Sequence, residues 1–145
     1  MKILFVDDDK FFMQPYVDVF IAQPNSLTVN IVNTAVKAQN ILSEIENVGY
    51  DCLVFDVMMP PPPGWEARTE DGKFTGTELV KEYQDIIVAI GLPVLILSNI
   101  GVAALTTRVN SLGLSRHLIE VRSKILTPPA DAKALVLELI ARRDV

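Results

Sequence analysis

The chain has 145 residues, of which 50% are hydrophobic and 21% are charged, and its formal net charge at pH 7 is −5. This length and hydrophobic share predict one domain, residues 1–145, with a buried core. The negative charge argues against nucleic acid as a partner, because phosphate backbones attract lysine- and arginine-rich surfaces. The single cysteine excludes an internal disulfide bond, and no apolar stretch approaches the roughly 18 residues that span a membrane. No signal peptide is visible, so we expect a soluble cytoplasmic protein without a membrane partner.

Segments typical of strands and helices alternate along the chain. Short apolar runs predict strands at residues 2–6, 28–32, 51–57, 93–98 and 117–122. Amphipathic stretches predict five helices, at residues 10–23, 35–47, 77–90, 102–112 and 130–143. This alternation predicts an α/β fold in which a doubly wound parallel sheet carries helices on both faces.

Two segments depart from this alternation. Pro15 falls inside the first predicted helix, where it removes a backbone donor, so the helix should kink there or start later. Residues 60–75 (PPPPGWEARTEDGKFT) combine four consecutive prolines with an Asp-Gly turn dipeptide. We interpret residues 61–75 as an inserted loop after the third strand, in which residues 65–69 and 73–75 pair as a hairpin.

Polar side chains follow the apolar runs of four predicted strands. The first run is followed by Asp7, Asp8 and Asp9, the third by Asp56, the fourth by Ser98, and the fifth by Lys124. A carboxylate next to a buried strand is costly unless a cation or a hydrogen-bond donor meets it. Because ligands bind beyond the carboxyl ends of parallel strands, these groups predict one shared site for a phosphate and a cation.

The order and spacing of these pieces resemble the receiver domain of bacterial two-component response regulators. The matching pieces are ILFVDDD at 3–9, VFDVMMP at 54–60, GTELVKEY at 76–83, LILSN at 95–99 and Lys124. The resemblance covers nearly the whole chain. It implies a flavodoxin-like sheet with the strand order 2-1-3-4-5.

The resemblance also implies a phosphoacceptor signalling domain that stands alone and is not an enzyme. A histidine kinase or a phosphotransfer protein would donate a phosphoryl group to Asp56. Lys124 would pair with the phosphate and Ser98 would contact it, shifting a surface at 102–112 and 117–122 that binds a downstream protein. Mg²⁺ or Mn²⁺ would neutralise the transferring group. The implied metal ligands are Asp8, Asp56 and the backbone carbonyl of Met58, with Asp7 acting through water.

Three features depart from the receiver pattern. Ile125 follows Lys124 where the family has a proline whose cis bond aims the lysine, so this loop should be built differently. Val121 stands where the family often has an aromatic residue that moves on phosphorylation. The insertion lengthens the loop that starts beside Asp56, and we hypothesise that it is a lid or docking hairpin for one partner.

Two other functions are compatible with the sequence. A pseudo-receiver would bind partners without being phosphorylated, and the missing proline favours it. A phosphatase of the haloacid-dehalogenase type also uses Asp, Ser or Thr, Lys and Mg²⁺. Its D-x-D motif would fall on Asp7 and Asp9, which leaves Asp56 unexplained.

Overall fold

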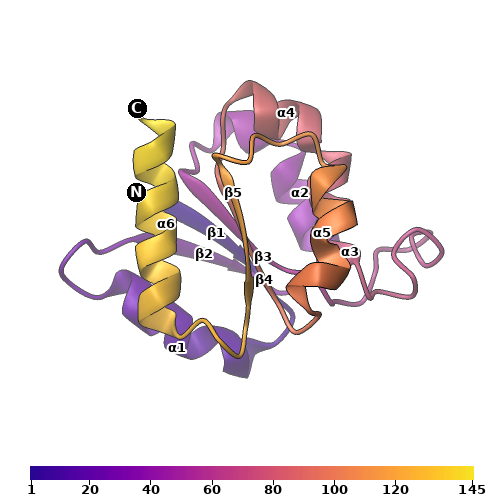
Figure 1. The fold of residues 1–145 in the computed structure, drawn as a ribbon, viewed down its shortest axis with the longest axis horizontal. Helices are drawn as coiled ribbons and strands as arrows, with labels where there is room; N and C mark the ends of the chain where they lie inside the picture. The colour runs from indigo at the N-terminus through magenta and orange to yellow at the C-terminus, as the bar shows by residue number, and fades with distance from the viewer.

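The computed structural model describes residues 1–145 as a parallel sheet with helices on both faces (Figure 1). The strands are β1 (Lys2–Val6), β2 (Thr28–Val32), β3 (Cys52–Asp56), β4 (Val94–Ser98) and β5 (Ile119–Ser123). They pair in the order β2-β1-β3-β4-β5, and every pair is parallel. The predicted flavodoxin-like sheet is therefore confirmed.

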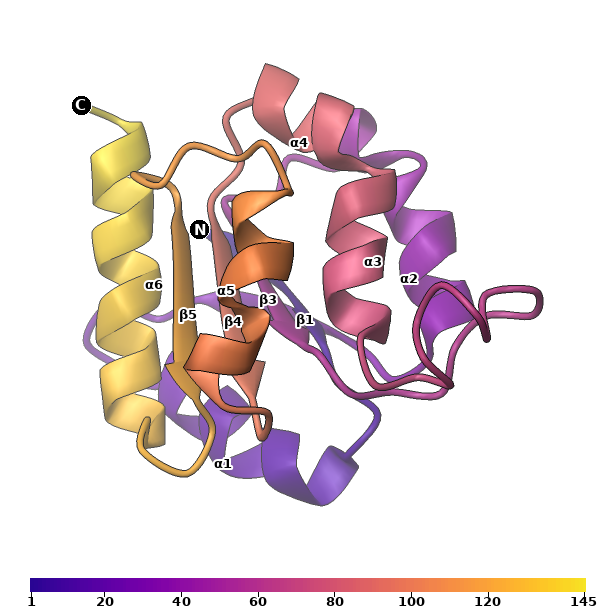
Figure 2. The same cartoon turned by 45° about the vertical axis from the view of Figure 1, so that its right-hand side comes forward.

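The helices divide between the two faces of the sheet. They are α1 (Lys10–Ile21), α2 (Ala35–Leu42), α3 (Thr75–Glu82), α4 (Gln84–Ala89), α5 (Val102–Asn110) and α6 (Pro129–Arg143), with a short 3-10 helix, η1 (Ile45–Asn47). α1 and α6 lie side by side on one face, and α2, α3 and α5 cover the other (Figures 1 and 2). No helix combines the length and the apolar character needed to cross a membrane.

The apolar runs form strands because both faces of the sheet are buried. Successive side chains of a strand point to opposite faces. In β1, Ile3 and Phe5 pack with α1 and α6, whereas Leu4 and Val6 pack with the helices of the other face. A strand covered on both sides needs a continuous apolar run, so its first polar residue marks the edge of the sheet.

One predicted helix is two helices in the structure. The stretch 77–90 divides at Tyr83, which ends α3 and precedes α4, so the structure has six α-helices where the sequence predicted five. The backbone leaves the helical region at Tyr83, with φ −107° and ψ 17°. Its hydroxyl donates a hydrogen bond to the Gln39 carbonyl of α2 at 3.3 Å, and Ile87 of α4 is buried in the core. Apolar periodicity alone does not show such a break, because both halves carry inward-facing residues.

The predicted hairpin in the insertion is wrong. Residues 61–74 form turns without strands, and Thr75 already belongs to α3. Glu70, Asp71 and Gly72 all have positive φ, at 50°, 56° and 94°. This left-handed run curls the chain back on itself, so that the Asp71 amide bonds the Glu66 carbonyl at 2.8 Å instead of a facing strand. The loop projects from the molecule beside the start of α3 (Figure 2).

Pro15 does not delay the first helix. α1 begins at Lys10 and includes Pro15, which excludes the later start. The side chain of Asp9 caps the helix by accepting a hydrogen bond from the Phe12 amide at 3.0 Å. This cap satisfies one of the free donors of the first turn, which supports the helix start ahead of the proline.

Candidate functional site

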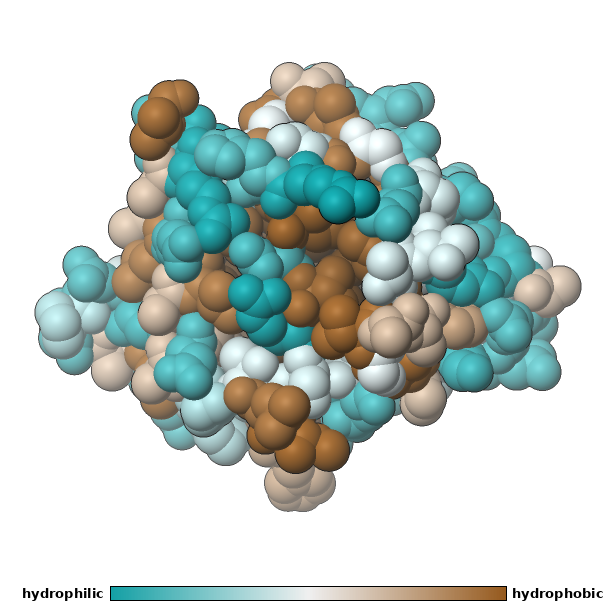
Figure 3. All heavy atoms as spheres, in the orientation of Figure 1, coloured by the Kyte–Doolittle hydropathy of each residue, from teal (hydrophilic) through white to brown (hydrophobic).

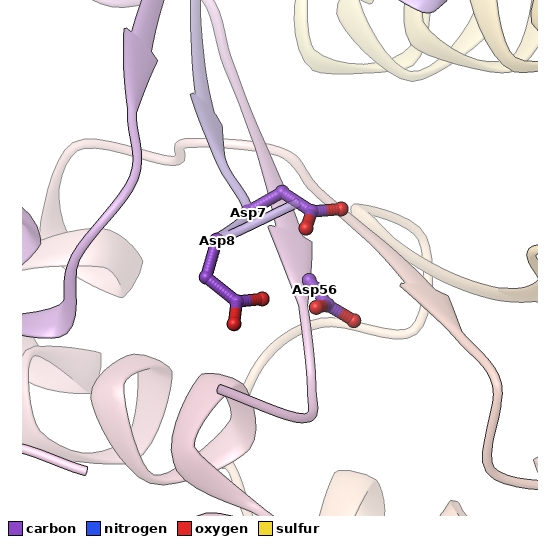
Figure 4. A group of neighbouring side chains, drawn as sticks. All are labelled: Asp7, Asp8 and Asp56. Carbon is purple, nitrogen blue, oxygen red and sulfur yellow. The ribbon is translucent and has the colours of Figure 1, made fainter. Parts of the chain in front are cut away.

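Three carboxylates gather where β1 and β3 end. The register pairs Val6 with Phe55, which brings the next residues, Asp7 and Asp56, side by side. One carboxylate oxygen from each of Asp7, Asp8 and Asp56 lies within 4.8 Å of the others (Figure 4). Asp7 and Asp56 are buried, and Asp8 is exposed. The cluster therefore has two buried members and one member open to solvent.

Lys124 enters this cluster from the far side of β4. Its Nζ atom lies 3.0 Å from Asp7 Oδ2 and 3.0 Å from Asp56 Oδ1. Its backbone amide donates to the Ser98 carbonyl at 2.9 Å, which continues the pairing of β5 with β4 by one residue. The structure thus brings the lysine to the carboxylates without a proline after it.

One lysine shared by two buried carboxylates leaves an excess of negative charge. Burial, followed by repulsion from Asp7, raises the pKa of Asp56 to about 7, although Lys124 opposes the shift. Burial also raises the pKa of Asp7. For Lys124, burial alone would lower the pKa, but attraction to Asp56 and then to Asp7 outweighs it and the pKa is raised. The site is therefore built to attract a further cation.

The donor set at this edge fits a hard divalent ion. With the three carboxylates ionised and Lys124 protonated, the four side chains carry a net charge of −2. Asp7 Oδ2 is buried and accepts no well-aligned hydrogen bond, even though the lysine is close. Carboxylate oxygens are the ligands that Mg²⁺ and Mn²⁺ prefer.

The loop after β3 contains the backbone carbonyl that is expected from the sequence as a further ligand. The carbonyls on either side of Met58 are occupied: Val57 accepts from the Gly76 amide at 2.8 Å, and Met59 accepts from Thr75 Oγ1 at 2.7 Å. The Met58 carbonyl accepts no hydrogen bond from the protein. No protein group therefore competes with an ion for this oxygen.

Gly76 brings the start of α3 against the end of β3. A Cβ atom at this position would lie 1.9 Å from the Asp56 carbonyl oxygen and 2.9 Å from Val57 Cα. Real Cβ atoms do not approach backbone atoms so closely, so only glycine fits here. The insertion therefore leaves the start of α3 in direct contact with the backbone of Asp56.

Ser98 ends β4 with a buried side chain. Its Oγ atom accepts a hydrogen bond from the Ile100 amide at 2.9 Å, and its hydroxyl donates to no protein group. The hydroxyl hydrogen is therefore available to an acceptor at the strand ends. Residues 99–101 lead directly from Ser98 into α5.

Similar solved structures decide the fold family, whereas no protein-family model and no curated protein matches the sequence. A CheY-like response regulator receiver domain protein from Methanospirillum hungatei JF-1 has a TM-score of 0.72 at 19% identity, over 99% of this chain and 95% of that one. A LuxR-family two-component response regulator from Aurantimonas sp. SI85-9A1 has a TM-score of 0.70 at 19% identity, over 97% and 84% of the two chains. The phosphorylated cyanobacterial phytochrome response regulator RcpA has a TM-score of 0.66 at 18% identity, over 93% and 87%. The chain has the receiver fold.

Within this receiver fold, Asp9 lies outside the carboxylate cluster. Its side chain caps α1, and its backbone amide donates to Asp7 Oδ1 at 2.9 Å. A D-x-D phosphatase would need Asp7 and Asp9 to act together at the substrate. The structure instead gives Asp9 a role in starting the helix and Asp56 the place beside Asp7.

Two aromatic residues of α1, Phe12 and Tyr16, also lie at the candidate site, and neither was among the predicted site residues. The Phe12 ring centroid lies 4.2 Å from Lys124 Nζ, and the Tyr16 hydroxyl donates to the Thr127 carbonyl at 2.6 Å. The available signal was an aromatic pair four residues apart on the first helix. That spacing shows that the two rings are neighbours, but not which loop they face.

Proposed function

We propose that this receiver-fold chain accepts a phosphoryl group on Asp56 from the phosphohistidine of a histidine kinase or a phosphotransfer protein. The observation that carries the proposal is the pairing of Asp56 and Asp7 with one lysine at 3.0 Å from each. A carboxylate at a strand end, with a fixed cation beside it, supports a role for Asp56 as the phosphoryl acceptor. Asp8 adds the exposed carboxylate of the same cluster.

The chemistry at Asp56 is a displacement at phosphorus. A bond forms between a carboxylate oxygen of Asp56 and phosphorus while the bond from phosphorus to the histidine nitrogen breaks. Lys124 holds Asp56 in place before transfer and pairs with the phosphoryl oxygens after it. Asp7, Asp8, Asp56 and the Met58 carbonyl would hold Mg²⁺ or Mn²⁺, which would supply charge neutralisation for the transferring group.

We further propose that Ser98 senses the product. Its free hydroxyl hydrogen would bond a phosphoryl oxygen, and this contact exists only in the phosphorylated state. A contact made in one state alone shifts the population toward that state. The movement would pass through residues 99–101 into α5, of which only Leu105 is buried.

The face formed by α5 and β5 is the proposed surface for a downstream protein. Figure 3 shows hydrophobic residues in the hollow at the centre of the face on which β5 and α5 lie, with both hydrophilic and hydrophobic residues around it. The residues of β5 are all half-buried rather than fully covered. We propose no nucleic-acid contact and no enzymatic turnover beyond the domain's own phosphorylation and dephosphorylation.

Intact mass after incubation with Mg²⁺ and acetyl phosphate tests this function. We expect the wild-type protein to gain one phosphoryl group and Asp56→Asn to gain none. Asp18→Asn is the matched control, because Asp18 is exposed on α1 and bonds only Gln14 there. This control should be modified like the wild type.

Other outcomes would support the alternative functions. An unmodified wild-type protein under all conditions would contradict the proposal and favour a pseudo-receiver scaffold. Release of phosphate from monoesters over many turnovers would favour a phosphatase. Equal modification of wild type and Asp56→Asn would place the acceptor elsewhere.

A further inference from the structure

The loop that carries Lys124 has little to anchor it within its own sequence. It lacks a proline after the lysine, and Ile125 and Leu126 are 83% and 80% exposed. Their side chains therefore do not fix the loop by packing in the core. The lysine itself is nevertheless buried and lies within 3.0 Å of two carboxylates. Something outside the loop must hold it.

Tyr16 supplies an anchor for the backbone of this loop. The tyrosine is buried on α1, and its hydroxyl donates to the Thr127 carbonyl at 2.6 Å and lies 3.5 Å from the Lys124 carbonyl. It thus contacts both ends of the exposed turn. The ring is fixed in turn by Phe5, edge-to-face at 6.2 Å, and by Phe12 at 4.7 Å between centroids.

The ring of Phe12 lies beside the ammonium group of Lys124. Its centroid lies 4.2 Å from Lys124 Nζ, within the range in which a ring attracts a cation. The ammonium group therefore has an aromatic face beside it in addition to Asp7 and Asp56. Phe12 and Tyr16 are one helical turn apart, so one helix contacts both the lysine head group and the backbone that carries it.

We propose that Phe12 and Tyr16 are positioning residues that aim Lys124 at Asp56, in place of the proline brace that this chain lacks. The proposal rests on the proposed function in one respect: the position of the lysine is expected to affect the rate of phosphoryl transfer. The other part of the proposal is structural and concerns only the position of the Lys124 side chain. The two parts are tested by different measurements.

The position of the lysine is tested by ¹H–¹³C NMR of the Lys124 ε-methylene group, without any phosphodonor. A methylene group next to an aromatic face is shifted upfield by the ring current. We expect upfield-shifted ε signals in the wild type and their return to ordinary lysine values in Phe12→Leu. Phe11→Leu is the matched control, because Phe11 is the preceding residue and is 94% exposed. Ordinary ε shifts in the wild type, or unchanged shifts in Phe12→Leu, would overturn the proposal.

The effect on phosphoryl transfer is tested by a double-mutant cycle, in which rates of phosphorylation are measured with acetyl phosphate and Mg²⁺. Tyr16→Phe removes one hydroxyl and should slow phosphorylation about 3- to 10-fold, the range that corresponds to one hydrogen bond. In a Lys124→Ala background the same change should have little effect, because the residue through which it acts is gone. Tyr83→Phe, which removes another tyrosine hydroxyl bonded to a backbone carbonyl, should leave the rate unchanged.

Equal slowing by Tyr16→Phe in both backgrounds would show a general structural role and overturn the positioning role. No slowing in either background would overturn it too. If the wild type takes up no phosphoryl group at all, the proposed function fails, and the lysine ε shifts still decide whether Phe12 holds the lysine.

Discussion

Lys124 shows why this position requires a long cationic side chain. Asp56 ends β3 and Lys124 follows β5, with β4 between them. Neighbouring strands lie about 4.8 Å apart, so the two backbones are separated by roughly two such spacings. The lysine crosses the end of β4 and still reaches Asp56 at 3.0 Å. The direction of the Lys124 side chain depends on contacts from α1, because the loop that follows Lys124 is exposed.

The raised pKa of Asp56 predicts a pH-dependent stability. Burial, followed by repulsion from Asp7, raises this pKa from 3.8 to about 7, so the folded state binds the proton more tightly than the unfolded state does. The contribution of Asp56 to stability is therefore complete below the unfolded pKa and is lost as the pH rises through the folded pKa. From about pH 4 to about pH 7, we expect the wild-type free energy of unfolding to fall relative to Asp56→Asn by on the order of 2–4 kcal/mol.

Urea unfolding across this pH range, without divalent ions, provides the measurement. Asp18→Asn is the control and should follow the wild-type curve, because Asp18 is exposed. Parallel curves for wild type and Asp56→Asn would show that Asp56 ionises normally in the folded protein.

At the scale of elements, Gly76 ties α3 to the end of β3. An added Cβ would overlap the Asp56 carbonyl oxygen at 1.9 Å, and that oxygen belongs to backbone that cannot rotate away. We expect Gly76→Ala to destabilise the protein by about 1–3 kcal/mol or more. Gly101→Ala is the matched control, because an added Cβ there meets nothing within 4 Å and φ is −55°. Thermal unfolding of the two variants measures this difference in stability. Equal melting temperatures would contradict the close approach of Gly76 to the Asp56 backbone.

The insertion contacts α5 through one arginine. The guanidinium of Arg108 lies 3.7 Å from the Phe74 ring centroid, and its nitrogens lie 2.6 Å from Glu70 and 4.0 Å from Glu78. These contacts join the insertion and the start of α3 to a helix with a single buried residue, Leu105. The lid or docking role that we expect from the sequence stays a hypothesis. The contacts of Arg108 join the insertion to α5.

Loss of Arg108 should therefore loosen α5. We expect Arg108→Ala to speed amide hydrogen exchange in α5 and to cost about 1 kcal/mol of stability, since its ion pairs and ring contact are partly exposed. Lys37→Ala is the control, because Lys37 is exposed on α2 and its side chain bonds only Asn33. Unchanged exchange in α5 would mean that the insertion does not hold the helix.

The sequence predicts some elements better than others for physical reasons. All five strands lie within two residues of their predicted bounds. The three central strands, β1, β3 and β4, are the clearest, because burial on both faces demands a continuous apolar run. The break at Tyr83 and the turns of 61–74 depend on contacts with α2 and on left-handed backbone, which apolar periodicity does not encode. The polar site residues were found because each follows a strand. The hydrogen bond from Tyr16 to Thr127 was not predicted, since it joins residues 111 positions apart.

At the scale of the whole molecule, charge concentrates where the strands end. The chain carries a net charge of −5, and the four site side chains account for −2 when the carboxylates are ionised. Repulsion within the site opposes folding at neutral pH, and an ion bound only by the folded state would relieve it. One bound cation would thus link the fold to the proposed function.

Mg²⁺ should therefore stabilise the folded protein. Binding to the folded state alone adds about 2.7 kcal/mol at a concentration of 100 times Kd. We expect the melting temperature of the wild type to rise with Mg²⁺ at neutral pH and that of Asp8→Asn to rise much less, because Asp8 is the exposed carboxylate of the cluster and a proposed ligand. Asp18→Asn should respond like the wild type. Equal responses of the wild type and Asp8→Asn would place the ion elsewhere.

We propose that Asp56 is the residue that carries the phosphoryl group. Borohydride converts an aspartyl phosphate to homoserine, which peptide mass spectrometry then locates in the chain. After reaction with acetyl phosphate and Mg²⁺ and reduction with borohydride, we predict homoserine at position 56 alone. Homoserine at position 7 or 8, or none at any position, would contradict the account.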